Sequence, residues 1–359
     1  MYKMLYLNLV FKRKASILAV SLLVICYPAL VTATDIPSFT IEYLGTFGGR
    51  HSSANALNDK GQVVGDYYTS TGENRAFYWD SGIMRDIGVL VSSDDSSIAW
   101  AINNKGQVTG LSYNSDRQSN DSSAFLWDPI NGMIDLGSPG PGFTQMRGND
   151  INDQGLIAGM AYDYNSPRLR TDVFIWDEQA GIRSIGSFHE GYMTSEINAI
   201  NNNGQVVGRT YDSVAFVATE GKEWTTLESL QPIEAVSAFD INDKGKIVGS
   251  SGLRAIMWDC DGVSALPNLF GGTNYGASDS TARAINEQDW VVGSSKDRVY
   301  GGGPHAVLWI SGEIFDLNDL VIGLDSETQL WYATDINEHN QIVGYIRISQ
   351  RHNIQLAAK

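Results

Sequence analysis

The chain has 359 residues, and its 41 acidic and 25 basic side chains give a formal net charge of −16 at pH 7. Such a surface repels nucleic acid and anionic lipid, which argues against nucleic-acid binding and against binding at a membrane surface. Of the two cysteines, only Cys260 lies beyond the N-terminal leader described next, so no disulfide can form within the mature chain. Cys260 is expected in an exposed turn.

Residues 1–33 have the pattern of a secretory signal peptide. Basic residues at 12–14 precede an apolar run from Ala15 to Val31, and the small residues up to Ala33 favour cleavage before Thr34. No later apolar run is long enough to span a bilayer. The sequence therefore predicts a protein that is secreted, periplasmic or extracellular, with no membrane span after cleavage. An uncleaved membrane anchor is the alternative.

One phrase, Ile-Asn-x-x-Gly-x-Val-Val-Gly, recurs through residues 34–359 with small variations. Its asparagine returns at steps of 41 to 51 residues, at Asn58, Asn103, Asn152, Asn201, Asn242, Asn286 and Asn337. A period of about 40–50 residues indicates one supersecondary unit repeated as an array. Residues 34–359 are therefore expected to form a single domain of seven repeats.

Each repeat holds four short apolar segments, rich in β-branched and aromatic residues and separated by turn residues, as in AFYW from Ala76 and MRDIG from Met84. This pattern is typical of β-strands, and consecutive apolar residues indicate strands buried on both faces. Four strands to a repeat of this length predict an all-β fold, a β-propeller. An open β-solenoid is the alternative.

The turn after the repeated asparagine has a defined expected geometry. Asn-x-x-Gly fits a type I turn followed by a left-handed residue, and Asp289 and Asn340, which replace the glycine in two repeats, tolerate that conformation best. A second glycine closes the next strand in every repeat, where it indicates a bulge or a close backbone approach. Both glycines and the asparagine are interpreted as structural.

The two ends of the chain are expected to meet in one blade. The seventh repeat ends after its third strand, near Asn353–Ala357, and the missing fourth strand is found at Phe39–Gly45. The prediction is thus seven four-stranded blades, closed by the N-terminal strand pairing in the last blade. The fourth repeat lacks the tryptophan of its third strand, at Ala218, so its blade is expected to be irregular, and six or eight blades stay open.

Function is expected on the face that carries the long, variable loops, because binding residues concentrate on variable loops of a rigid frame. A tyrosine-rich recognition surface is predicted there, with ordinary solvated loops as the alternative; its members are Tyr67, Tyr68, Tyr113, Tyr162, Tyr164, Tyr211, Tyr275 and Tyr300. Acids precede the repeated Ile-Asn in three repeats and would form an acidic ring in the channel or bond to nearby backbone; they are Asp150, Asp240 and Asp335.

No catalytic motif, metal site or cofactor site is predicted. There is no nucleophile elbow, zinc motif or phosphate loop, and Lys244 stands at a ligand position of the calcium-like DINDKG.

The third-strand segment His305-Ala306-Val307-Leu308-Trp309 and the opening IEYLGTFGG resemble the HAF-repeat family of probable extracellular proteins. The resemblance implies a secreted or surface protein and brings no established activity. Three hypotheses follow: a non-enzymatic propeller that binds an extracellular protein or glycan, a polysaccharide hydrolase or lyase with acids in the channel, and a structural surface-layer component.

Overall fold

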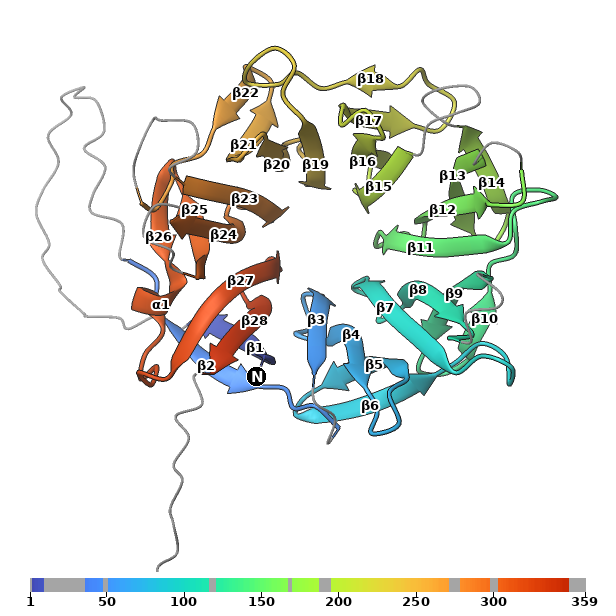
Figure 1. The fold of residues 1–359 in the computed structure, drawn as a ribbon, viewed down its shortest axis with the longest axis horizontal. Helices are drawn as coiled ribbons and strands as arrows, with labels where there is room; N and C mark the ends of the chain where they lie inside the picture. The colour runs from blue at the N-terminus through green and yellow to red at the C-terminus, as the bar shows by residue number, and fades with distance from the viewer. Residues whose placement is uncertain are drawn as a thin grey trace, which may run out of the picture.

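The structure is a computed structural model, and it describes residues 2–9, 36–47, 51–115, 121–166, 170–186, 195–270, 278–297 and 303–348. These residues form antiparallel sheets arranged around a central axis, with the sheets fanned outward from that axis (Figure 1). The innermost strands contact one another in order around the axis, and β27 contacts β3. The all-β prediction is confirmed.

The strands fall into seven groups of four. The first two groups are β3 (Ser52–Leu57), β4 (Val63–Tyr68), β5 (Asn74–Asp80), β6 (Ile83–Gly88), and β7 (Ser96–Ile102), β8 (Val108–Tyr113), β9 (Ser122–Asp128), β10 (Gly132–Asp135). The third and fourth are β11 (Gln145–Ile151), β12 (Ile157–Asp163), β13 (Arg170–Asp177), β14 (Gly181–Gly186), and β15 (Ser195–Ile200), β16 (Gln205–Thr210), β17 (Ala215–Thr219), β18 (Thr225–Thr226).

The fifth and sixth groups are β19 (Val236–Ile241), β20 (Ile247–Ser251), β21 (Arg254–Asp259), β22 (Gly262–Ala265), and β23 (Ser278–Ile285), β24 (Val291–Asp297), β25 (Pro304–Ile310), β26 (Glu313–Asp316). The seventh is β27 (Thr328–Ile336), β28 (Ile342–Ile348), β1 (Tyr2–Leu9) and β2 (Phe39–Tyr43). A single parallel pairing, Gln145 with Ser122, joins the second and third groups into one eight-stranded sheet. The one helix of the described residues, α1 (Leu317–Leu320), is far too short to cross a bilayer.

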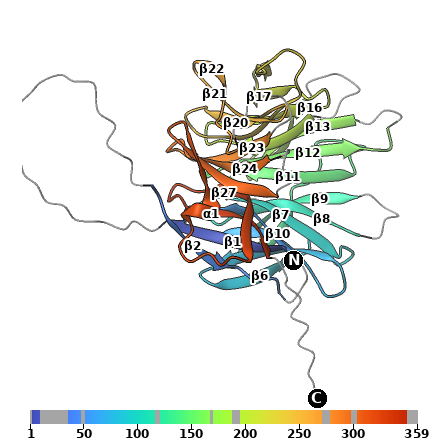
Figure 2. The same ribbon diagram turned by 60° about the vertical axis from the view of Figure 1, so that its left-hand side comes forward.

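The seventh group is built from both ends of the chain, with the strand order β2-β1-β28-β27. Figures 1 and 2 show β1 and β2 in the same part of the molecule as β27 and β28, and β1 pairs with both β28 and β2. The expectation that Phe39–Gly45 supplies the fourth strand is thus met by β2, Phe39–Tyr43. The third strand differs from the expectation: that place is taken by Tyr2–Leu9, from the segment assigned to the leader, and Asn353–Ala357 lies outside the described residues.

The pairing register explains why Tyr2–Leu9 fits the third place. Leu5 pairs with Gly344, just as Phe77 pairs with Gly65 in the first group. Met4 and Leu7 are buried, in the clusters on the two sides of the seventh group. An alternating apolar segment therefore satisfies the same packing as the recurring third-strand motif.

The hydrophobic core lies between neighbouring groups and not within one central cluster. One cluster combines Met4 and Val343 of the seventh group with Ala54, Val63 and Phe77 of the first. Because each group is covered on both faces by its neighbours, its middle strands carry consecutive apolar residues, as the sequence pattern indicated.

The fourth group is irregular, as expected from its missing tryptophan. Its outer strand β18 has only two residues. Trp224, which follows β17 in the chain, stacks on Phe216 with ring centroids 4.6 Å apart. The aromatic packing of the motif is thus partly restored from outside the strand.

The repeated turns have the predicted geometry. The N–H of Gly61 donates to Asn58 O at 3.0 Å, and Lys60 N donates to Asn58 Oδ1 at 3.1 Å, so the asparagine bonds backbone two residues on. Asp289 and Asn340 have φ values of 63° and 58°, in the left-handed region where the other repeats have glycine. The second glycine marks a close approach, because a Cβ at Gly65 would lie 1.8 Å from Ser53 O.

Candidate functional site

The end of the channel at the repeated turns is held by two rings of hydrogen bonds. In the first ring, the Nδ2 of each repeated asparagine donates to the carbonyl of the next one at 2.8 to 3.2 Å, and Asn337 donates to Asn58. In the second, the backbone N–H of the following residue donates to a side-chain oxygen of the next turn, and Glu338 N donates to Asp59 Oδ1. The polar groups at this end therefore hold neighbouring groups of strands together, and they also line a hollow of about 320 Å³.

Every innermost strand carries a bulge, and the bulged residues line the channel. The register of β3 shifts between Ala54 and Ala56, which leaves Asn55 unpaired in the ladder. The equivalent residues in the other groups are Trp100, Asn149, Asn198, Phe239, Arg283 and Thr334. Four side chains of this set donate to a carbonyl of the next innermost strand: Asn55, Asn149, Asn198 and Thr334.

The three predicted channel acids bond to backbone on both carboxylate oxygens. Asp150 accepts from Ile151 N at 2.8 Å and from Ile200 N, in the next group, at 2.7 Å. Asp240 accepts in the same way from its own group and from Ile285 N. Asp335 accepts from its own group and from the first group. The alternative of local backbone bonding is therefore the one that matches the geometry.

The pKa values of these three carboxyl groups are raised. Burial raises the pKa of Asp150 to about 6 and that of Asp240 to about 7, and it raises the pKa of Asp335 well above its ordinary value. The two backbone N–H donors lower each pKa, and the charges of the other acids in the channel raise those of Asp240 and Asp335. The titrations of the three groups are therefore coupled.

The other end of the channel, where the long loops begin, holds two cavities. The first has a volume of about 350 Å³ and is lined by Arg147, Tyr162, Tyr164, Glu196 and neighbours. The Arg147 guanidinium carbon lies 5.2 Å from the ring centroids of both Trp100 and Tyr162. Its Nε and Asn149 Oδ1 are buried without a hydrogen-bond partner. Two buried polar atoms of β11 are thus left without a hydrogen-bond partner, one of them in an arginine that lines this cavity.

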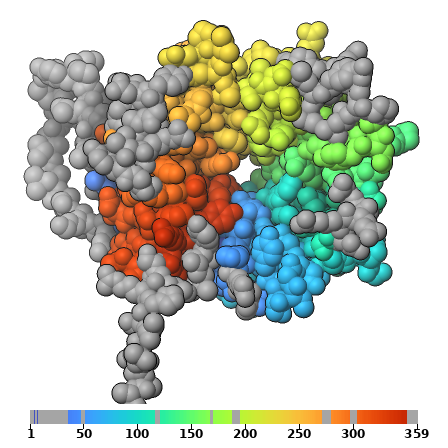
Figure 3. Space-filling view, viewed as in Figure 1, coloured from blue at the N-terminus to red at the C-terminus, as the bar shows by residue number. Residues whose placement is uncertain are grey.

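The second cavity, here called the Arg283 cavity, has a volume of about 400 Å³; its walls include Asn198, Phe239, Arg283, Tyr332, Thr334 and Tyr345. The Arg283 guanidinium carbon lies 4.5 Å from the ring centroid of Phe239. Tyr332 and Tyr345 meet edge to face with centroids 6.5 Å apart. The middle of the face shown in Figure 3 is hollowed. Both cavities have the size and mixed lining of small-ligand sites.

The predicted tyrosines divide into different environments. Tyr162 and Tyr164 stack on one another with centroids 5.9 Å apart and line the first cavity. Tyr68, at the end of β4, and Tyr211, in a turn, are exposed, and Tyr113 is half-buried. Tyr275 and Tyr300 lie outside the described residues.

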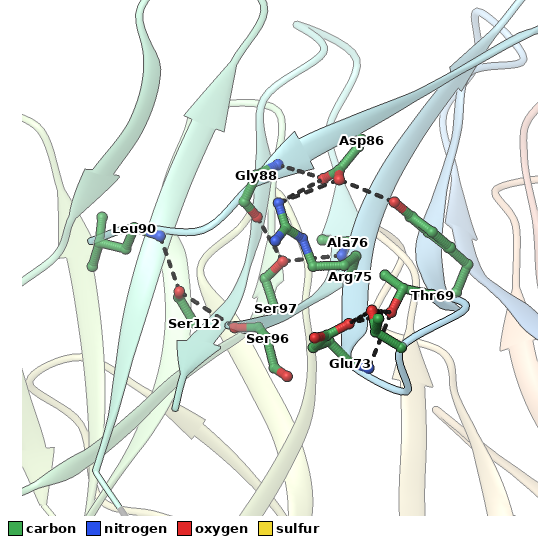
Figure 4. A network of polar contacts seen from close by, with 12 residues as sticks. Thr69, Glu73, Arg75, Ala76, Asp86, Gly88, Leu90, Ser96, Ser97 and Ser112 are labelled. Carbon is green, nitrogen blue, oxygen red and sulfur yellow. Dashed lines mark hydrogen bonds and ion pairs between the residues drawn. The ribbon is translucent and has the colours of Figure 1, made fainter. Parts of the chain in front are cut away.

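Tyr67 is a structural residue and is not available to a ligand, contrary to its place in the predicted surface. It is 6% exposed, and its hydroxyl donates to Asp86 Oδ2 at 3.0 Å. Asp86 also forms an ion pair with Arg75 at 3.3 Å, within the network of Figure 4. In the same network, Ser97 of the second group accepts from Ala76 N and donates to Gly88 O, which joins two groups.

Sequence reasoning missed Phe239 and Arg283, which line the second cavity, and Trp100, which contacts Arg147 of the first. Trp100, Phe239 and Arg283 occupy the bulge position two residues before the repeated isoleucine, where four other repeats have asparagine or threonine. That departure from the majority is a signal that comparison of the repeats could have found. Cys260 is exposed between β21 and β22, as expected for a turn.

The comparisons with known proteins identify the fold. A family model described as "Protein of unknown function (DUF3466)" matches residues 130–223, and no curated protein matches the chain. The solved structure titled "YCF48 bound to D1 peptide" is similar with a TM-score of 0.54 and 11% identity, over 88% of this chain and 96% of that chain.

Two further solved structures are similar over most of their length. The β-propeller domain of the Trilobed protease from Pyrococcus furiosus gives a TM-score of 0.52 at 12% identity, over 80% of this chain and 90% of that one. Virginiamycin B lyase from Staphylococcus aureus gives 0.51 at 11% identity, over 84% and 98%. At identities this low, structural similarity shows a shared fold and does not show a shared activity. The chain therefore has a β-propeller fold.

Proposed function

We propose that the chain is a secreted, non-enzymatic binding protein that recognises an extracellular protein or glycan at the loop end of its channel. In this proposal residues 1–33 direct export, and residues 34–359 form a closed propeller of seven blades of the HAF-repeat type. The two hydrogen-bonded rings support closure, because each returns from the seventh group to the first. The contact between β27 and β3 supports it too.

The observation that carries the binding function is the pair of cavities at the loop end. Both combine an arginine held over an aromatic ring with further tyrosines. Guanidinium groups and tyrosines are the residues most enriched at recognition hot spots, since each offers a large contact area and directional hydrogen bonds. By contrast, the polar groups at the opposite end bond to one another in the two rings. A ligand is thus expected at one end only.

An extracellular polysaccharide hydrolase or lyase is the second candidate, favoured by the raised pKa values of the channel acids. The geometry weighs against it, because each carboxylate already accepts backbone N–H groups on both oxygens. General acid–base chemistry needs an oxygen within reach of a substrate proton. A structural surface-layer role is the third candidate, and the two cavities lined by arginine and tyrosine argue for a ligand instead.

The test is a binding screen of the purified protein against arrayed glycans and extracellular proteins. We expect at least one ligand whose binding is lost in the double variant Tyr162→Ala/Tyr164→Ala, with circular dichroism unchanged. Tyr43→Ala, at an exposed tyrosine of β2, is the matched control and should bind as the original chain does. Turnover of a glycan that disappears in Asp240→Asn would overturn the proposal in favour of an enzyme.

A further inference from the structure

In most repeats the side chain at the bulge position of the innermost strand bonds to the next innermost strand. The side chain of Arg283, at the same position, does not. In four repeats the residue at this position donates to a carbonyl of the next strand, as Asn198 does to Ala238 O at 2.7 Å. Arg283 lies over the ring of Phe239, the bulge residue of the preceding group, with its guanidinium carbon 4.5 Å from the ring centroid. Its guanidinium group therefore faces the channel and does not fasten two strands.

The positive charge of Arg283 is not balanced by a carboxylate among the described residues that line its cavity. Among the described residues that line the Arg283 cavity there is this one cation and no carboxylate. Two other arginines lie beside carboxylates: Arg209 lies 2.8 Å from Glu196, and Arg254 lies 3.1 Å from Glu234. Desolvation by the channel walls lowers the pKa of Arg283, although the side chain keeps access to channel water. A cation in such a place gains most from an anionic ligand.

Resting on the proposed function, we propose that the Arg283 cavity binds the carboxylate of an acidic sugar residue in a glycan. The ring of Phe239 supports one face of the guanidinium group and leaves its N–H edge to form two parallel hydrogen bonds with a planar carboxylate. A single guanidinium group suits a single negative charge, whereas phosphate groups are usually held by several donors or cations.

The rest of the cavity favours a sugar over a peptide terminus. Capture of a peptide carboxylate typically uses a nest of backbone N–H groups. In this channel the amides at the bulges are already bound: Ile285 N donates to Asp240, and Leu57 N donates to Asp335. The cavity instead offers the edges and faces of Tyr332 and Tyr345, amphipathic surfaces that suit a ring with polar substituents on an apolar frame.

The experiment measures binding of the full chain to oligogalacturonate, oligoalginate and hyaluronan oligosaccharides by titration calorimetry. Each is paired with its carboxyl-reduced, neutral counterpart. We expect at least one acidic oligosaccharide to bind, and its reduced form to bind at least about tenfold more weakly, since hydrogen bonds to a charged group are worth a factor of about 10 to 100. A sulfated neutral glycan and a pool of peptides with free C-termini complete the panel.

Two substitutions assign the effect to the guanidinium group. Arg283→Gln should weaken binding of the acidic oligosaccharide by about 10- to 100-fold and leave binding of its reduced form unchanged. Arg283→Lys should recover part of the loss, because an ammonium group keeps the charge without the bidentate geometry. Lys222→Gln, at an exposed loop, removes the same charge elsewhere and should leave binding unchanged.

The outcomes separate this inference from the proposed function. Equal binding of acidic and reduced oligosaccharides, no effect of Arg283→Gln, or a preference for the sulfated glycan or the peptides would overturn the carboxylate assignment. Any of these would leave a binding propeller in place. Absence of binding to every glycan and protein of both screens would overturn the proposed function itself.

Discussion

The carboxylate of Asp240 accepts a hydrogen bond from Ile285 N at 2.8 Å, and this bond joins the fifth group of strands to the sixth. The same carboxylate accepts from Ile241 N in its own group. Asp150 and Asp335 repeat the arrangement in the third and seventh groups. One buried carboxylate thus accepts a backbone N–H beside the bulge of its own strand and another beside the bulge of the next innermost strand. Because three repeats use this arrangement, three ionisable groups lie in one channel.

This arrangement makes stability depend on pH. Because burial holds the pKa of Asp150 at about 6 and that of Asp240 at about 7, above the value of 3.8 for a free aspartate, the folded state binds more protons than the unfolded state between these values. The stabilisation is fully present below the unfolded pKa and is lost as pH rises through the folded ones. We expect the melting temperature to fall between pH 5 and pH 8.

Asp240→Asn should flatten that fall, because an amide keeps one acceptor and does not titrate. The difference between pH 5 and pH 8 in unfolding free energy should shrink by about 1–3 kcal/mol, given about 1.4 kcal/mol per proton and pH unit. Denaturant titrations at several pH values measure it. Asp261→Asn, on an exposed turn, is the control. An unchanged pH profile in Asp240→Asn would refute the account.

Asn201→Ala should destabilise the fold by about 2–4 kcal/mol, since it removes a buried side chain that bonds in two directions. Its Nδ2 donates to Asn242 O at 3.0 Å, and its Oδ1 accepts from Gln205 N at 3.0 Å. Asn203→Ala in the same turn alters an exposed side chain and should cost about 1 kcal/mol or less. Similar losses in the two variants, measured by urea unfolding, would contradict the role of the buried asparagine.

Gly65→Ala should destabilise by several kcal/mol or prevent folding, because the new Cβ would lie 1.8 Å from the backbone oxygen of Ser53. Backbone on the neighbouring strand cannot move away without breaking the ladder. Gly140→Ala adds the same methyl group where no atom lies within 4 Å, and it should be tolerated. Thermal unfolding of both variants checks this, and equal melting temperatures would disprove the close approach as the reason for glycine.

Removal of residues 1–33 tests two predictions together. The first is that these residues are a cleaved leader, and the second is that another segment can then form the third strand of the seventh group. We expect an exported chain to begin at Thr34, as mass spectrometry would show, and to remain folded because Asn353–Ala357 then replaces β1. The reason is its pattern: His352, Ile354 and Leu356 match the spacing of His305, Val307 and Trp309.

The matched comparison places Ile354→Asp in the full chain and in residues 34–359. The substitution should destabilise the shorter chain by about 2 kcal/mol or more and leave the full chain unchanged, where Met4 and Leu7 already occupy the buried positions. Failure of residues 34–359 to fold, or equal effects in both chains, would exclude the replacement.

The repeated residues made the fold predictable, and the unrepeated ones made the site unpredictable. Each turn reuses Asn and a left-handed residue, usually Gly, for local reasons, so its geometry follows from residues three apart in sequence, as at Asn58 and Gly61. The Arg283 cavity brings together residues of four separate repeats, from Asn198 to Thr334, and only the closing of sheets around an axis makes them neighbours. Tyr67 was placed on the wrong surface because the pairing of its hydroxyl with Asp86 depends on the register of three strands.

The seventh group has a consequence for how the chain is made. Ile322 N donates to Phe39 O at 2.8 Å, so a strand from before the first group must meet residues that follow the sixth group before this sheet is complete. Contacts this distant in sequence carry a large loop-closure entropy and slow folding, and until they form the outer edge of the seventh group stays open to pairing with other chains. The seventh group is therefore expected to form late in folding, which leaves a window in which chaperones or crowding decide between folding and aggregation.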